Sequence, residues 1–162
     1  MPKVLIIDAN ERHSHLLSTQ LTGHGFEVSV ANRAVQGVEL AIQGSPDLIL
    51  MDGFMPDQTG FQMCNQLRRH KATQSIPIVM MSGIAHYANQ QAFALERGAT
   101  AYLTKSRVTI EVGEIVDKYL SWKPGKQPAK APPPQKSFSA STDIHKALSN
   151  HLHQALDDNK NG

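Results

Sequence analysis

The first residue with the type and position to do chemistry is Asp52, which ends an apolar run within residues 47–56. The apolar residues 48–51 are too few for a helix and predict a buried strand. Pro56 and Gly60 then bend the chain into a loop. A lone carboxylate at the mouth of a parallel strand lies where α/β folds place their chemistry. Asp52 is therefore the first candidate for a chemical role.

Strand-like and helix-like patterns alternate five times between residues 4 and 120. The runs that predict strands lie at residues 4–7, 26–30, 48–51, 76–81 and 101–103. Helices between them are predicted from apolar residues at helical spacing: Leu16, Leu17 and Leu21; Val35, Val38 and Ile42; Phe61, Cys64 and Leu67; a segment from His86 to Arg97; and a last helix from Val108 to Leu120. This alternation predicts a parallel sheet covered by helices on both faces.

Right-handed crossovers favour a flavodoxin-like, doubly wound five-stranded parallel sheet with five helices, in the strand order 2-1-3-4-5. The first and third strands are neighbours in that order. Asp8 follows the first strand directly, as Asp52 ends the third. Because the carboxyl ends of parallel strands meet at one edge of the sheet, we expect both acids in one crevice.

The ordered residues at these strand ends resemble those of bacterial response-regulator receiver domains of the single-domain, CheY-like kind, over residues 3–120. The resemblance implies that Asp52 is the aspartate that takes a phosphoryl group from a histidine kinase. It implies that Ser82 hydrogen-bonds the phosphoryl oxygen and that Lys105 pairs with it. Ser82 and Tyr102 would together form the conformational switch of the family.

The acidic pair of the family is incomplete in this chain. Two adjacent acids usually follow the first strand, whereas this chain has Asp8 and Ala9. The missing acid is, in the family, usually a direct ligand of Mg²⁺. Because Mg²⁺ keeps several waters and can be bound by one or two carboxylates, the resemblance implies a weakened site made by Asp8, Asp52 and the backbone carbonyl of Phe54. The alternative is a pseudo-receiver, which acts by binding alone.

Lys105 is followed by Ser106, where the family usually has a proline joined by a cis bond. A cis bond before any other residue costs roughly 2.5–4 kcal/mol. We therefore expect a trans bond here, which leaves open how the lysine is placed.

The composition changes after residue 122, so we predict a receiver domain at residues 1–122 and a linker at residues 123–136. The linker holds five prolines and four lysines with no acid, which is typical of an extended, solvated chain. The tail at residues 137–162 carries apolar residues at intervals of four, which predicts an amphipathic helix. A single helix of this kind cannot bury its own apolar face. It would dock on the receiver, pair with another copy as a dimer, meet a partner, or fray.

Composition narrows the class of protein. The formal net charge of +2 is too small to argue for nucleic acid, and the N-terminal apolar run is too short for a membrane segment. The single cysteine, Cys64, excludes an internal disulfide and favours a reducing compartment, so we expect a cytoplasmic protein and a buried thiol. The pairs His13/His15 and His151/His153 would point to different helix faces, which favours solvated positions over metal ligands.

The resemblance implies a two-component (phosphorelay) response regulator that accepts a phosphoryl group on Asp52 and signals by protein–protein contact. It would not be a multiple-turnover enzyme. The expected partners are a sensor histidine kinase or phosphotransfer protein and a downstream protein target, without nucleic acid or membrane insertion. Two alternatives stay open: a phosphorylation-independent pseudo-receiver adaptor, and an adaptor attached to a membrane or polymer through residues 123–162.

Overall fold

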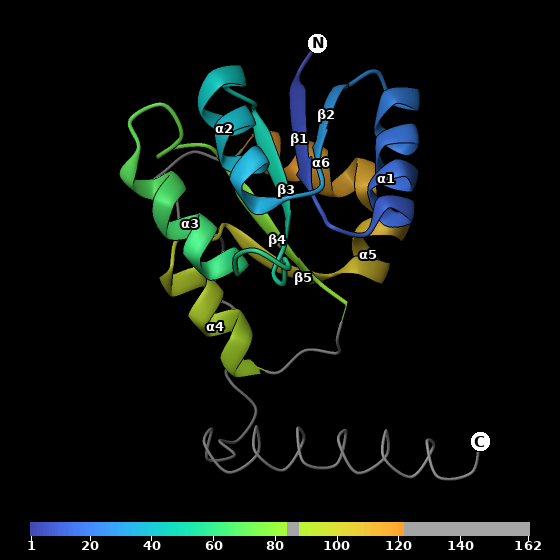
Figure 1. Ribbon diagram of the computed structural model, residues 1–162. Coiled ribbons are helices and arrows are strands. Elements are labelled where there is room, and N and C mark those ends of the chain that lie inside the picture. Colours follow the sequence, from blue (N-terminus) through green and yellow to red (C-terminus); the bar gives the residue numbers. More distant parts are fainter. Residues whose placement is uncertain (84–87, 122–162) are drawn as a thin grey trace, which may run out of the picture. The chain divides into compact units, whose positions relative to one another are not determined.

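A five-stranded parallel sheet forms the centre of the protein (Figure 1). The computed structural model describes residues 1–83 and 88–121. The strands are β1 (Lys3–Ile7), β2 (Glu27–Ala31), β3 (Leu48–Asp52), β4 (Ile78–Ser82) and β5 (Ala101–Thr104). The helices are α1 (Glu11–Gly23), α2 (Ala34–Gly44), α3 (Gly60–Arg69), α4 (Ala88–Glu96), α5 (Lys105–Ile110) and α6 (Val112–Leu120). The order β2-β1-β3-β4-β5 confirms the predicted flavodoxin-like topology.

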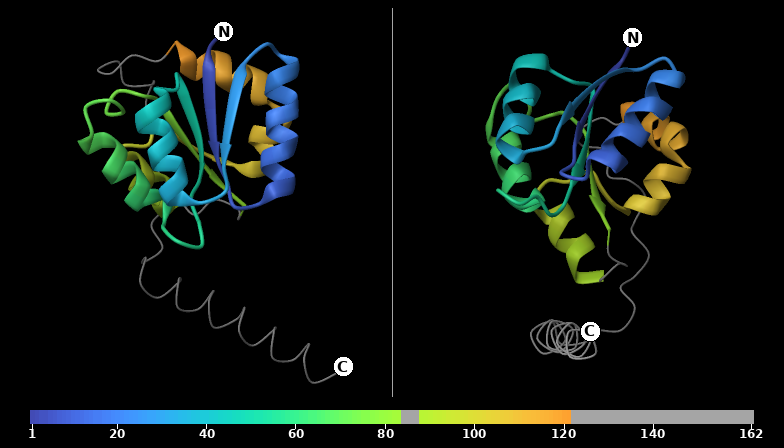
Figure 2. Two further views of the ribbon diagram at one scale, coloured as in Figure 1. Left: turned by 45° about the horizontal axis from the view of Figure 1, so that its top comes forward. Right: turned by 45° about the vertical axis from the view of Figure 1, so that its right-hand side comes forward.

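Helices cover both faces of the sheet, as the doubly wound fold requires (Figure 2). Alternate residues of each strand enter two separate apolar layers. Leu5, Ile49 and Met80 pack on the side of α2, α3 and α4. Val4, Leu50 and Met81 pack on the side of α1, α5 and α6. Because both faces are covered, β3 and β4 are buried at every position, whereas the edge strand β2 is mostly half-buried or exposed.

Cys64 lies in α3 and faces the first of these layers. It is fully buried, as predicted, and burial raises the pKa of its thiol to about 11. The helix that carries it begins with a capping box, in which the Thr59 hydroxyl accepts from the N–H of Gln62 and the Gln62 side chain accepts from the N–H of Thr59. The cysteine is therefore a packing residue in a well-anchored helix.

The prediction of a single last helix is wrong, because the structure divides this segment into α5 and α6. Residues 1–83 and 88–121 therefore contain six helices rather than the predicted five. The break falls at Glu111, whose φ of −112° and ψ of 22° are not helical. Four β-branched residues surround it, at positions 108–110 and 112, and such residues crowd a helix. Of the two resulting helices, α5 begins at Lys105, directly after the last residue of β5.

Two apolar side chains that were predicted to face the core are exposed, Leu16 to 46% and Val35 to 63%. On α1 the buried positions are Ser14, Leu17 and Leu21 instead. On α2 the residues that face the sheet are small, namely Ala34, Gly37 and Ala41. A methyl group at Gly37 would lie 2.7 Å from Cδ1 of Ile7, so α2 approaches β1 too closely for a larger side chain.

The predicted linker at residues 123–136 and the predicted tail helix at residues 137–162 lie outside the described residues and stay predictions. The same holds for His86, where the fourth helix was expected to begin, and for His151 and His153. Within residues 1–83 and 88–121, no helix has the length and apolar character needed to cross a bilayer.

Gly60 tests how tightly the loop after β3 is packed. A Cβ atom at this residue would lie 2.8 Å from Cα of Gly53 and 3.0 Å from the carbonyl oxygen of Asp52. We expect Gly60→Ala to lower the free energy of unfolding by about 1–3 kcal/mol, because the backbone must move. Urea denaturation measures the change. Gly44→Ala is the control, since nothing lies within 4 Å of its Cβ position. Equal stability of the two variants would contradict the close approach.

Candidate functional site

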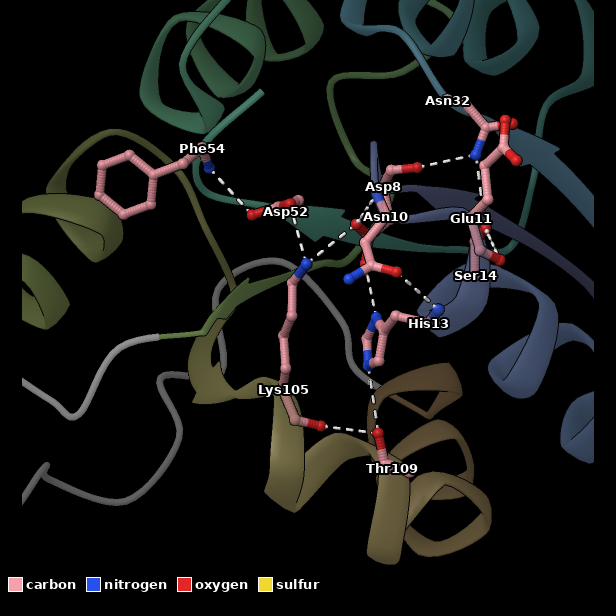
Figure 3. A network of polar contacts seen from close by, with 10 residues as sticks. All are labelled: Asp8, Asn10, Glu11, His13, Ser14, Asn32, Asp52, Phe54, Lys105 and Thr109. Atoms are coloured by element: carbon pink, nitrogen blue, oxygen red, sulfur yellow. Dashed lines mark hydrogen bonds and ion pairs between the residues drawn. The ribbon is translucent and has the colours of Figure 1, made fainter. Parts of the chain in front are cut away.

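Asp52 is the last residue of β3, and its carboxylate lies at the carboxyl edge of the sheet (Figure 3). The strand register pairs it with Met81 of β4, while the preceding residue pairs with Ile7 of β1. Its Oδ1 accepts a hydrogen bond from the N–H of Phe54 at 3.0 Å. The residue is 6% exposed, so the carboxylate is almost, but not wholly, removed from water.

Asp8 follows β1 directly and is fully buried. Its backbone is fixed at the end of β2, because its N–H donates to the carbonyl of Ala31 at 3.0 Å and its own carbonyl accepts from Nδ2 of Asn32 at 2.9 Å. Its Oδ1 accepts from the N–H of Asn10, the residue that caps α1, at 2.9 Å. The neighbouring strands therefore bring Asp8 and Asp52 to one edge of the sheet, as predicted.

Lys105 joins the two acids. Its Nζ lies 2.9 Å from Oδ1 of Asp8 and 3.0 Å from Oδ2 of Asp52. The side chain comes from the first residue of α5, whose N-terminus is capped by the hydroxyl of Thr104. The bond between Lys105 and Ser106 is trans, as predicted. The lysine therefore reaches the acids without a proline after it.

Burial and pairing act in opposite directions on the pKa values of these groups. Burial alone would raise the pKa of Asp8, but hydrogen bonds, from His13 and Lys105 above all, outweigh it and hold that pKa below its ordinary value. Burial outweighs the hydrogen bonds at Asp52, so its pKa lies above the ordinary value. Burial would lower the pKa of Lys105, but the two carboxylates raise it. Asp52 is therefore the acid whose charge is less completely compensated.

Ser82 lies on β4, the strand beside β3, and Tyr102 lies on β5, the strand beyond β4. Ser82 ends β4, is fully buried and pairs in register with Thr104 of β5. Tyr102 is 1% exposed, and its hydroxyl donates to Oε1 of Gln90 in α4 at 2.9 Å. Tyr102 consequently connects β5 to α4.

His13 contradicts the interpretation of the sequence, which expected a solvated side chain. Its Nδ1 lies 2.5 Å from Oδ2 of Asp8, and its Nε2 lies 3.1 Å from Oγ1 of Thr109. Helical side chains lean towards the N-terminus, so a residue in the first turn of α1 can reach the acid that precedes the helix. That spacing was the signal available in the sequence. His15 is exposed, as predicted.

The two carboxylates fit a hard divalent cation in their chemistry. Asp8 and Asp52 each direct one oxygen to the position of Nζ of Lys105, and carboxylate oxygens are ligands that Mg²⁺ prefers. Ala9 adds no oxygen and packs, partly buried, against the core. In the part of the chain that the structure describes, no group of three or more His, Cys, Asp or Glu side chains is suited to a metal. The residues that could hold such a cation are Asp8 and Asp52 through their carboxylates and Phe54 through its backbone carbonyl.

The topology and this acidic edge define a known class of protein. A family model described as "Response regulator receiver domain" matches residues 4–117. The chain therefore belongs to the response regulator receiver family, whose members act in two-component signalling and generally bind Mg²⁺ at the acidic site.

Two curated relatives illustrate how much of a longer protein the match covers. The DNA-binding dual master transcriptional regulator RpaA of Synechocystis is 39% identical over 106 residues, which are 65% of this chain and 43% of RpaA. Protein PilH of Pseudomonas aeruginosa is 34% identical over 105 residues, which are 65% of this chain and 86% of PilH. The chain thus spans less than half of the first relative and most of the second.

Solved structures share this fold. A putative response regulator from Chloroflexus aurantiacus is similar with a TM-score of 0.69 and 26% identity, over 75% of this chain and 100% of that one. The chemotaxis response regulator CheY4 of Vibrio cholerae is similar with a TM-score of 0.65 and 25% identity, over 72% of this chain and 98% of that one.

Removing the ammonium group tests the pairing of the two acids. We expect Lys105→Met to lower the free energy of unfolding at neutral pH by about 1–3 kcal/mol, because two carboxylates lose their shared cation. The loss should shrink as the pH falls through the pKa values of the two acids, since protonated carboxyl groups need no cation. Urea denaturation at several pH values measures it. The exposed Lys71, changed to Met, is the control, and equal stability of both variants would contradict the pairing.

Proposed function

We propose that the protein is a phosphoacceptor and that Asp52 takes a phosphoryl group from a sensor histidine kinase or phosphotransfer protein. The observation that supports this most directly is the contact of Asp52 with Lys105, at 3.0 Å, while the N–H of Phe54 orients the other carboxylate oxygen. Asp8 is fully buried, whereas Asp52 keeps some exposure. Asp52 is thus the acid that an incoming phosphoryl group can reach.

In the proposed reaction a carboxylate oxygen of Asp52 attacks phosphorus and forms an O–P bond while the P–N bond of the donor phosphohistidine breaks. The leaving imidazole takes a proton. Lys105 pairs with the phosphoryl oxygens, and the hydroxyl of Ser82 donates to one of them. Mg²⁺, held by Asp8, Asp52 and the carbonyl of Phe54, would supply further charge neutralisation. The acceptor is modified rather than regenerated in this step, so the protein is not a multiple-turnover enzyme.

The signal would leave the protein through a protein–protein contact. Tyr102 lies on β5 and bonds to Gln90 of α4, and Ser82 ends the strand beside it. A phosphoryl group on Asp52 that engages Ser82 would alter how β4 and β5 support α4. The affinity of a downstream protein for that surface would then change.

A phosphorylation-independent adaptor is the second candidate. Two observations favour it: Ala9 provides no third carboxylate, and both oxygens of Asp8 already accept hydrogen bonds from the chain. In this case Lys105 and the two acids would serve to hold the fold, and partner binding would be constitutive.

Acetyl phosphate distinguishes the two candidates. With Mg²⁺ present, we expect intact-protein mass spectrometry to find one added phosphoryl group and to lose it in Asp52→Asn, because that variant has no nucleophilic carboxylate. Asp57→Asn is the matched control, an exposed acid five residues on that accepts from the N–H of Ala34 at the start of α2. An adduct that persists undiminished in Asp52→Asn would refute the assignment. No adduct in any protein would favour the adaptor.

Restoring the second acid tests the weakened cation site. We expect Ala9→Asp to bind Mg²⁺ several-fold more tightly, because it adds a hard oxygen ligand. Without metal the same variant should be less stable, because three carboxylates then repel one another. Calorimetric titration and thermal unfolding measure the two effects. Ala72→Asp, at an exposed position far along the chain, is the control. Unchanged Mg²⁺ affinity would mean that residue 9 does not face the site.

A further inference from the structure

Helices α3 and α4 are neighbours on one face of the sheet (Figure 1), and a stack of three side chains lies where they meet. The rings of Phe61 in α3 and Phe93 in α4 meet edge to face, with centroids 4.7 Å apart and an angle of 78° between the ring planes. The guanidinium of Arg97, which directly follows α4, lies 4.4 Å from the centroid of the Phe93 ring. Phe93 is 38% exposed, and Arg97 is exposed as well. The stack therefore presents an aromatic ring beside a cation at the surface.

The chain holds this stack in place from the side of α3. Arg68, in the last turn of α3, donates from Nε to the carbonyl of Gly98 at 2.9 Å and from Nη1 to the carbonyl of Ile76 at 2.7 Å. Because Gly98 follows Arg97 in the sequence, this contact fixes the end of α4 against α3. A binding surface that is already ordered loses less conformational entropy when a partner arrives.

The charge of Arg97 is not compensated by the residues that the structure describes. Within residues 1–83 and 88–121, Arg97 takes part in no ion pair, whereas Arg107, which is also exposed, pairs with Glu111 at 3.1 Å. A guanidinium that stacks on an aromatic ring keeps its N–H groups, which lie in its own plane, available to a carboxylate in a bidentate pair. Arg97 is therefore oriented to bind an incoming carboxylate.

Charge is distributed unevenly over the described residues. Residues 58–97, which include α3 and α4, contain four lysines and arginines and one acid, Glu96. Residues 1–57 and 98–121 contain six lysines and arginines and ten acids. An acidic partner is therefore attracted to the surface of α3 and α4 and repelled by the rest. A nucleic acid would instead need several phosphate contacts, and the guanidinium of Arg68 is already occupied by backbone carbonyls.

We propose that the stack of Phe61, Phe93 and Arg97 is a docking site for an acidic segment of a partner protein, in which a carboxylate pairs with Arg97 and a neighbouring apolar side chain covers the exposed part of Phe93. The inference rests on the proposed function in that it gives the chemistry of the partner that α4 would contact. Binding at the stack does not itself require a phosphoryl group on Asp52. The stack belongs to the layer of α2, α3 and α4, on the face of the sheet opposite to α1, α5 and α6.

The probe is a short blocked peptide in which one leucine stands between pairs of glutamates, titrated into the full chain and followed by amide NMR, which detects weak binding. We expect the shift changes to concentrate at Phe61, Phe93 and Arg97. Arg97→Gln should weaken binding of the peptide about tenfold, because a charge-assisted pair is lost. Arg107→Gln is the matched control, an exposed arginine on α5 that is already paired, and it should bind the peptide as the unchanged protein does. A second peptide, with glutamines in place of the glutamates, should bind more weakly than the acidic one.

Thermal unfolding of each variant establishes that it is folded before titration. The inference is overturned if the acidic peptide causes no shift change at the stack, if Arg97→Gln binds it as tightly as the unchanged protein, or if the glutamine peptide binds equally well. It is overturned equally if a single-stranded oligonucleotide binds there more tightly than the peptide, or if sedimentation shows that Arg97→Gln abolishes self-association, because the occupant is then a nucleic acid or a second copy. Peptide binding without an acetyl phosphate adduct would support this inference while contradicting the proposed function, and an adduct without peptide binding would contradict this inference alone.

Discussion

The site depends on the ion pairs that the ammonium group of Lys105 makes with Asp8 and Asp52. Neighbouring parallel strands bring two buried carboxylates to one edge, where like charges in a medium of low dielectric would repel each other. The shared cation at 2.9 Å and 3.0 Å removes that conflict. Because Lys105 is also the first residue of α5, the position of this helix and the geometry of the acids form a single constraint. The contacts of His13 and Gln20 with Thr109 hold α5 from its other side.

The strand order of the sheet, and the presence of Asp8 and Asp52 at its carboxyl edge, could be predicted from the sequence. The period of the apolar runs and the crossover rules favour this strand order, and the order brings Asp8 and Asp52 to neighbouring strand ends. The strand order does not place His13, because its contacts with Asp8 and Thr109 depend on the rotation of α1 about its axis and on the start of α5. The exposure of Val35 depends on the close approach of α2 to β1, which periodicity does not report.

The loop after β3 is anchored at several points. The N–H of Gly60 donates to the carbonyl of Gly53 at 2.9 Å. The carboxylate of Asp57 accepts from the N–H groups of Ala34 and Val35 at the start of α2, and the hydrogen bond from Ala34 helps hold the pKa of Asp57 below its ordinary value. Asp52 is thus followed by a loop that is tied both to the start of α3 and to the start of α2.

Because Cys64 is buried, its reactivity reports local opening of the structure around it. It is the only cysteine in the sequence, and its thiol is both enclosed and held protonated by the raised pKa. A thiol reagent therefore reacts at a rate set by how often α3 and the sheet separate, rather than by the chemistry of the thiol in the closed state. Labelling kinetics at this one position measure the free energy of opening the apolar layer between the sheet and α2, α3 and α4, with no probe added to the chain.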